Sequence, residues 1–78
     1  MTGMETYANR GGDSNVTHFA IGPDSITVRF RDGAEYLCTY STPGRSDVER
    51  MKELARQGTG LNEFISRTVK KRYERKLK

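Results

Sequence analysis

Two alternating runs of apolar and polar residues, separated by Asp32-Gly33, constrain the fold of this chain more than any other feature. Alternation is typical of β-strands with one buried face, and Asp-Gly is a frequent hairpin turn. A third run rich in β-forming residues, 15–21, precedes the turn signal Gly22-Pro23-Asp24. The sequence therefore predicts a three-stranded antiparallel meander, ended by Pro43-Gly44.

The hairpin register follows from which side chains must share a face. A two-residue loop would place Val28 opposite Leu37, whereas a three-residue loop with Gly33 left-handed in a bulge places Val28 opposite Tyr36. We prefer the three-residue loop because it gathers the large apolar side chains on one face. That face holds Ile26, Val28, Phe30, Tyr36, Cys38 and Tyr40.

Two helices are expected to cover this face. Ser46 and Glu49 have the spacing of a capping box at the start of the first helix, and Gly58 can end that helix in a left-handed cap. A second helix begins near Leu61 or Asn62, and its apolar stripe extends to Tyr73. The predicted fold class is α+β: a three-stranded meander followed by two helices packed on one face.

A chain of 78 residues makes one domain. Residues 1–13 are short of bulky apolar side chains and contain three glycines, so we expect a flexible N-terminal arm. Residues 14–76 form the single predicted domain. A basic terminal helix is its last element, and the final turns are polar on all sides, which predicts that they project past the core.

The chemistry available to the chain argues against catalysis. His18 is the single histidine and Cys38 the single cysteine, and they fall on different predicted strands. Structural zinc needs about four such ligands. We therefore expect no enzyme activity, no metal, no cofactor and no small-molecule substrate. Without a signal peptide or a long apolar run, the expected location is the cytoplasm, with no membrane insertion.

Positive charge is concentrated at the end of the chain. Residues 61–78 contain seven of the fourteen Lys and Arg and two of the ten acidic residues, a net charge of +5; the seven basic and eight acidic residues of 1–60 give −1. This balance is typical of proteins that bind polyanions, RNA above all. The expected phosphate contacts are Arg67, Lys70, Lys71 and Arg75, extended by Arg29 and Arg31 on the exposed sheet face.

Other interpretations of the same residues stay open. The basic helix can be a solvated face, with Glu63 paired to Arg67 and Lys70 to Glu74. The chain can instead be an adaptor that binds an acidic protein, or a partner at its sheet edge, with an apolar contact near Leu37 or Leu77.

Gly58-Thr59-Gly60 can offer amides to an anion, although a cap and a tight turn explain it. Tyr36 and Tyr40 are expected in the core, and Tyr73 at its edge.

Several short motifs resemble one known family. They are Ser14-Asn15-Val16, Phe19-Ala20-Ile21-Gly22, Ile26-Thr27-Val28-Arg29-Phe30, Asp32-Gly33-Ala34-Glu35-Tyr36, Gly58-Thr59-Gly60-Leu61-Asn62-Glu63-Phe64-Ile65 and Tyr73. Their order is similar to that of the KTSC domain, named for the C-terminus of some lysyl-tRNA synthetases. The family's Tyr-x-Tyr stands here as Tyr36-Leu37-Cys38. The resemblance implies one small α+β domain over 14–73, RNA as a suggested ligand, and no catalytic site.

Overall fold

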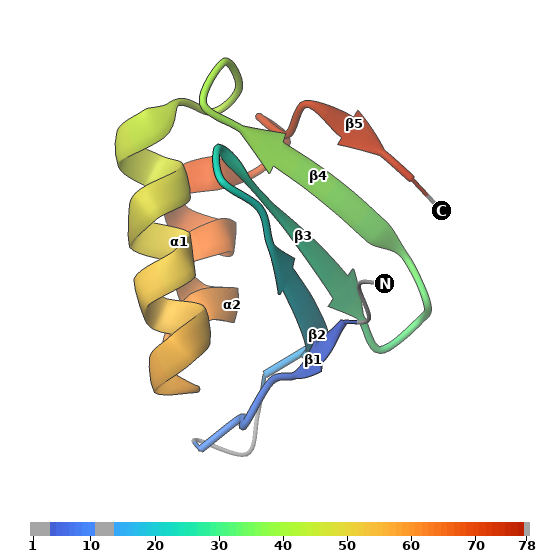
Figure 1. Ribbon diagram of the computed structural model, residues 1–78. Coiled ribbons are helices and arrows are strands. Elements are labelled where there is room, and N and C mark those ends of the chain that lie inside the picture. The colour runs from blue at the N-terminus through green and yellow to red at the C-terminus, as the bar shows by residue number, and fades with distance from the viewer. Residues whose placement is uncertain (1–3, 11–13, 78) are drawn as a thin grey trace.

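The computed structural model describes residues 4–10 and 14–77 and has one antiparallel sheet with helices on one face (Figure 1). The strands follow the order β1-β2-β3-β4-β5. The elements are β1 (Glu5–Thr6), β2 (Val16–Ile21), β3 (Ser25–Phe30), β4 (Glu35–Thr39), α1 (Arg45–Gln57), α2 (Leu61–Phe64), the π-helix η1 (Ile65–Val69) and β5 (Arg75–Lys76). The α+β class is confirmed, and the predicted meander is β2-β3-β4. The sheet has five strands, because a short edge strand pairs on each side of that meander.

The predicted hairpin register is confirmed. Val28 lies opposite Tyr36 and Ile26 opposite Cys38. The N–H of Phe30 donates to the carbonyl of Ala34 at 2.8 Å, and Gly33 has the left-handed φ of 89° that the three-residue loop requires. The face chosen from the sequence is therefore the one that meets the helices.

The core lies between this face and the helices. Burial of its apolar side chains drives the packing of helix against sheet. The buried apolar residues are Tyr7, Val16, Phe19, Ile26, Val28, Cys38, Val48, Met51, Leu54, Ala55, Leu61 and Val69. Lys52 is buried as well, and its ammonium is held by the Pro23 carbonyl at 3.1 Å and by Glu49 at 3.0 Å.

The predicted capping box is wrong, whereas the predicted end of α1 is confirmed. The helix begins at Arg45, one residue before the proposed cap, and its N-cap is Gly44 without a side-chain hydrogen bond. Because the Gly44 carbonyl already accepts from the N–H of Val48 at 3.0 Å, Ser46 lies inside the first turn. Gly58 ends the helix with a φ of 78°, and its N–H donates to Leu54.

Residues 4–10, which fall in the predicted flexible arm, lie against the sheet and the end of α1. Glu5 and Thr6 pair with β2, and the N–H of Tyr7 donates to the carbonyl of Thr17 at 2.9 Å. The Tyr7 ring is only 3% exposed, so it supplies the apolar anchor that this segment was thought to lack. The segment also reaches α1, where the N–H of Arg10 donates to Gly58 at 2.7 Å. Residues 1–3 and 11–13 lie outside the described residues.

The predicted basic terminal helix is also wrong beyond Val69. Lys70 has a φ of 52°, which reverses the chain, and residues 75–76 then form β5 against β4. The edge of β4 offers backbone partners that solvent-exposed helical turns would lack: the N–H of Glu74 donates to Leu37 at 2.8 Å and that of Leu77 to Glu35 at 2.7 Å. The last residues therefore fold back on the sheet and do not project from the core.

Candidate functional site

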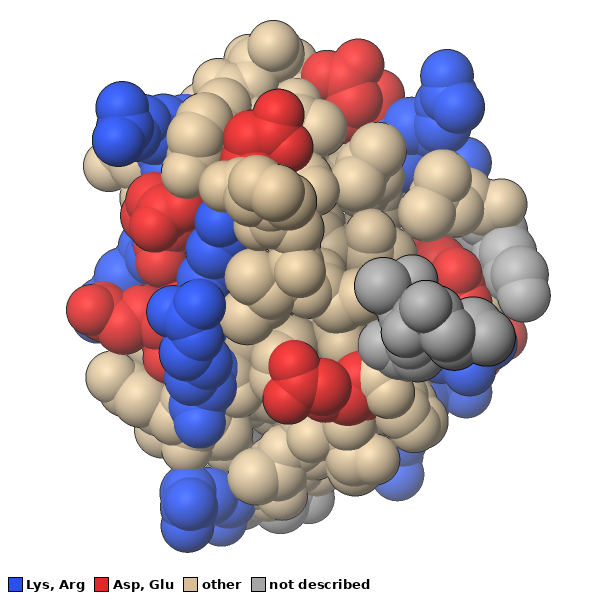
Figure 2. Space-filling view, in the orientation of Figure 1, with Lys and Arg blue, Asp and Glu red and all other residues tan. Residues whose placement is uncertain are grey.

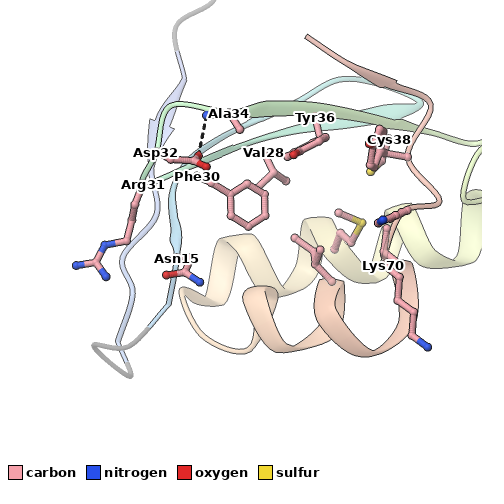
Figure 3. A pocket seen from close by; sticks show the side chains of 14 residues that line it. Asn15, Val28, Phe30, Arg31, Asp32, Ala34, Tyr36, Cys38 and Lys70 are labelled. Atoms are coloured by element: carbon pink, nitrogen blue, oxygen red, sulfur yellow. Dashed lines mark hydrogen bonds between the residues drawn. The ribbon is translucent and has the colours of Figure 1, made fainter. Parts of the chain in front are cut away.

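A cavity of about 510 Å³ opens between the sheet and the helices, at the end where η1 turns back toward β5 (Figure 3). Its lining residues separate by exposure. The floor is buried and apolar, made by Val28, Cys38, Met51 and Val69. The walls are half-buried, made by Phe30, Ala34, Tyr36, Ile65 and Tyr73. The mouth is exposed and polar, made by Asn15, Arg31, Asp32, Lys70 and Lys71.

Aromatic rings form much of the wall. Phe30 and Tyr36 meet edge to face, with 5.6 Å between ring centres, and Tyr36 and Tyr73 lie 4.5 Å apart. Tyr36 is half-buried, so the predicted core role holds for part of the ring while the rest borders the cavity. Lys76, opposite Tyr36 on β5, places its ammonium 6.0 Å from the centre of that ring, at the outer limit of a cation–π contact.

The π-helix η1 sets the position of the mouth. The N–H of Lys70 donates to the carbonyl of Ile65 at 2.6 Å, the i to i−5 spacing that widens a helical turn. Ile65 and Val69 thereby line the cavity, and Lys70 and Lys71 follow at once on the turn. Figure 3 shows Lys70 at the opposite end of the cavity from Asn15 and Arg31.

The predicted phosphate-contacting residues do not form one ridge. Arg67 pairs with Glu63 at 3.5 Å, as the alternative interpretation predicted, and Arg29 forms an ion pair with Glu35 at 2.9 Å. Arg75 lies on β5 opposite Leu37, the face of the sheet away from the helices. Of the predicted set, Arg31, Lys70 and Lys71 line the cavity, and Arg31 lies at the opposite end from Lys70.

The charged side chains of Glu74 and Arg72, also near the C-terminal end, form hydrogen bonds or ion pairs with neighbouring residues. Glu74 accepts from the Thr39 hydroxyl at 3.1 Å, so the predicted Lys70–Glu74 pair is wrong. Arg72 binds Asp47 at 3.2 Å and donates to the Thr68 carbonyl at 2.6 Å. On the face seen in Figure 2, most of the surface is uncharged, acidic residues are scattered over it, and a short run of basic side chains lies at the left. Arg31, Lys70 and Lys71, which line the cavity, are exposed and form no ion pair among the residues that the structure describes.

Three titratable groups, Cys38, Tyr40 and Glu49, have shifted pKa values. Burial, with a smaller contribution from the charge of Asp47, raises the pKa of the Cys38 thiol to about 11. The Tyr40 hydroxyl donates to Glu49 at 2.6 Å, which raises the pKa of Tyr40 and lowers the pKa of Glu49.

His18 and Cys38 point to opposite faces of the sheet. His18 lies opposite Arg29 in the strand register, whereas Cys38 lies opposite Ile26. The imidazole Nδ1 is 3.0 Å from the Thr17 hydroxyl. Within residues 4–10 and 14–77, no three His, Cys, Asp or Glu side chains gather as metal ligands would. In the same part of the chain, no helix has the length and apolar character needed to cross a bilayer.

Sequence reasoning missed both the cavity and Lys76. The cavity is lined from several separate segments, and its mouth depends on a helix that ends at Lys70 without a Gly, Pro or Asn there. The alternation of Phe30 and Tyr36 was the available signal, because it placed both rings on the helix-facing side. Comparison with known proteins adds no relative: no family model, no curated protein and no solved structure matches the chain.

Proposed function

We propose that the protein is a non-catalytic binding module for RNA, with its phosphate contacts at the mouth of the cavity. The observation that carries the proposal is the exposed group Arg31, Lys70 and Lys71, none of which forms an ion pair within the described residues. Free Lys and Arg can neutralise phosphates and release counterions, whereas cations already bound to carboxylates contribute less. The resemblance to the KTSC domain, itself a proposal, points to the same ligand.

The proposed surface differs from the sequence hypothesis in its members. Arg67 and Arg29 leave the contact set because each is already paired with a glutamate. Lys76 joins it because its ammonium stands near Tyr36, a wall of the cavity. Base-specific recognition needs hydrogen-bonding groups aimed at base edges, whereas the contacts proposed here are ionic contacts to phosphates. The expected binding is therefore sensitive to salt and tolerant of sequence.

An amide NMR titration tests this location. The labelled protein receives a short uridine-rich strand and, separately, a hairpin RNA, each at two salt concentrations. Saturable shifts centred on residues 70–76 and Arg31, weaker at the higher salt concentration, are the expected result. Shifts confined to α1, or diffuse shifts that do not saturate, would overturn the proposed surface.

A protein adaptor is the second candidate, and one observation favours it. Among residues 4–10 and 14–77, no helix covers the sheet face away from α1 (Figure 1), and Leu77, 42% exposed, donates its N–H to the Glu35 carbonyl of β4. The edge of β4 itself is occupied by β5, so addition of a partner strand there is disfavoured. This candidate predicts that Leu77→Ser abolishes partner binding, while removal of Lys70 and Lys71 charges leaves it unchanged.

A further inference from the structure

The cavity has the size and composition of a small-molecule site. Ligand pockets in proteins span roughly 300–1,000 Å³ and combine an apolar lining with a few polar groups. The present cavity, at about 510 Å³, lies within that range and has a floor of Val28, Met51 and Val69, each about 1% exposed. A ligand that enters it must therefore carry an apolar body.

Charge distinguishes the two ends of the cavity. Arg31 shares its end with the Asp32 carboxylate, which accepts from the N–H of Ala34 at 3.0 Å. Lys70 lies at the other end, Lys71 follows it in the chain and also lines the cavity, and Asp32 is the one carboxylate among the lining residues. Asp47, the nearby acid that acts on Cys38, is already bound to Arg72. An anionic group is best accommodated at the two lysines.

We propose that this cavity binds a small amphipathic anion, with an aromatic or other flat apolar body on the floor and a carboxylate or phosphate head at Lys70 and Lys71. The rings of Phe30, Tyr36 and Tyr73 supply aromatic contacts to the body. A nucleobase fits less well, because its polar edge would face the methyl and thioether groups of the floor and lose its hydrogen bonds. The site shares Lys70 and Lys71 with the proposed RNA surface and goes beyond it by using the apolar cavity that these lysines border.

Matched probes separate the two parts of the ligand. Naphthoate carries the apolar body and the anionic head, naphthamide has the same shape without charge, and acetate is the head alone. Methyl and amide NMR of the full chain follows Val28, Ile65 and Val69 on the floor and wall, and Lys70 and Lys71 at the mouth. Naphthoate is expected to give saturable shifts at both places, naphthamide to bind about tenfold more weakly, and acetate to give no saturable shift. Naphthyl phosphate then distinguishes phosphate from carboxylate as the preferred head.

Two variants link the binding to the cavity. Ala34→Leu adds bulk to a half-buried wall, and Lys70→Gln with Lys71→Gln removes the charge from exposed positions where folding should be preserved. Arg50→Gln with Arg56→Gln removes the same charge from α1, away from the lining, and is the control. The lysine pair should weaken naphthoate about tenfold, and the control should not.

Three results would overturn the inference: no saturable naphthoate shift, equal affinity for naphthamide, or tighter binding of adenosine monophosphate than of naphthyl phosphate. Each is measured without RNA, so failure here leaves the RNA proposal standing. Conversely, naphthoate binding in a protein that fails to bind RNA would support the cavity alone.

Discussion

The hydroxyl of Tyr7 accepts a hydrogen bond from the backbone N–H of Leu61, at 3.2 Å, and so joins the N-terminal segment to the first residue of α2. Both residues are buried, with Tyr7 at 3% and Leu61 at 0% exposure. The N–H groups at the start of a helix have no partner within the helix, and this one is kept from water. The phenol therefore satisfies a donor that sits at the start of the α2–η1 segment lining the cavity.

Replacement of Tyr7 by Phe should lower the free energy of unfolding by about 1–3 kcal/mol, because the ring still fills its place while the Leu61 N–H loses its partner. Urea denaturation checks the value, with Ser66→Ala on the exposed side of η1 as the control. Equal stability of the Phe variant and the wild-type protein would show that the segment is not held in this way.

Gly58→Ala should be more destabilising than Gly33→Ala. Both glycines have positive φ, 78° and 89°, so both alanine variants carry a backbone cost of about 1 kcal/mol. A Cβ at Gly58 would also meet the Cβ of Ala8 at 2.5 Å, whereas nothing lies within 4 Å of a Cβ at Gly33. The difference between the unfolding free energies of the Gly58→Ala and Gly33→Ala variants measures the contribution of the packing of residues 4–10 on α1. Equal losses would contradict that packing.

The Tyr40–Glu49 contact predicts a pH dependence with a defined sign. The hydrogen bond from Tyr40, followed by the contact with Lys52, holds the pKa of Glu49 below its ordinary value of 4.5. A carboxyl group whose pKa is lower in the folded state stabilises the protein at pH values above its unfolded-state pKa. This stabilisation is lost as the pH falls through the folded-state pKa. The stability difference between wild type and Tyr40→Phe should therefore be largest near neutral pH and shrink in acid. A difference that grows as pH falls would contradict the contact.

Cys38 should react slowly with thiol reagents in the native protein. Its side chain is 3% exposed and its pKa is raised from 9.0 to about 11, so the reactive thiolate is scarce at neutral pH. Because the folded-state pKa is the higher one, this group favours the folded state below pH 9.0 and that contribution is lost as pH rises toward 11. A chromogenic disulfide reagent measures the rate, which should rise sharply in urea. Rapid reaction of the native thiol would contradict its burial.

The elements that could be predicted are those whose signals lie within a few residues. Alternation of Val28 with Phe30 and the need for a left-handed residue at Gly33 were sufficient to give the meander and its register. Strands β1 and β5 have two residues each, too few to show alternation, and they form because free edges of β2 and β4 offer hydrogen bonds. The helical apolar pattern that extends to Tyr73 competes with this strand pairing. After Val69 the strand pairing prevails, and the chain leaves the helix to form β5.

The candidate site could be predicted from the sequence only in part. Net charge pointed to the C-terminal end of the chain, where Lys70 and Lys71 line the cavity, and Arg31 was named from the exposed sheet face. Charge counting does not show which cations are already paired, so Arg67 and Arg29 were included although Glu63 and Glu35 hold them. The apolar cavity beside these lysines depends on contacts between distant segments, which periodicity does not reveal.

The most direct test of the account is the salt dependence of binding to a fluorescent single-stranded RNA, compared between two variants of equal net charge. Lys70→Gln with Lys71→Gln removes charge at the mouth, and Arg50→Gln with Arg56→Gln removes it from α1. If both lysines contact phosphates, the slope of log affinity against log salt should fall in magnitude by about 1.4 for the lysine pair and stay at the wild-type value for the control. Equal loss in both variants would show that net charge alone attracts RNA, and would contradict a binding site at the mouth of the cavity.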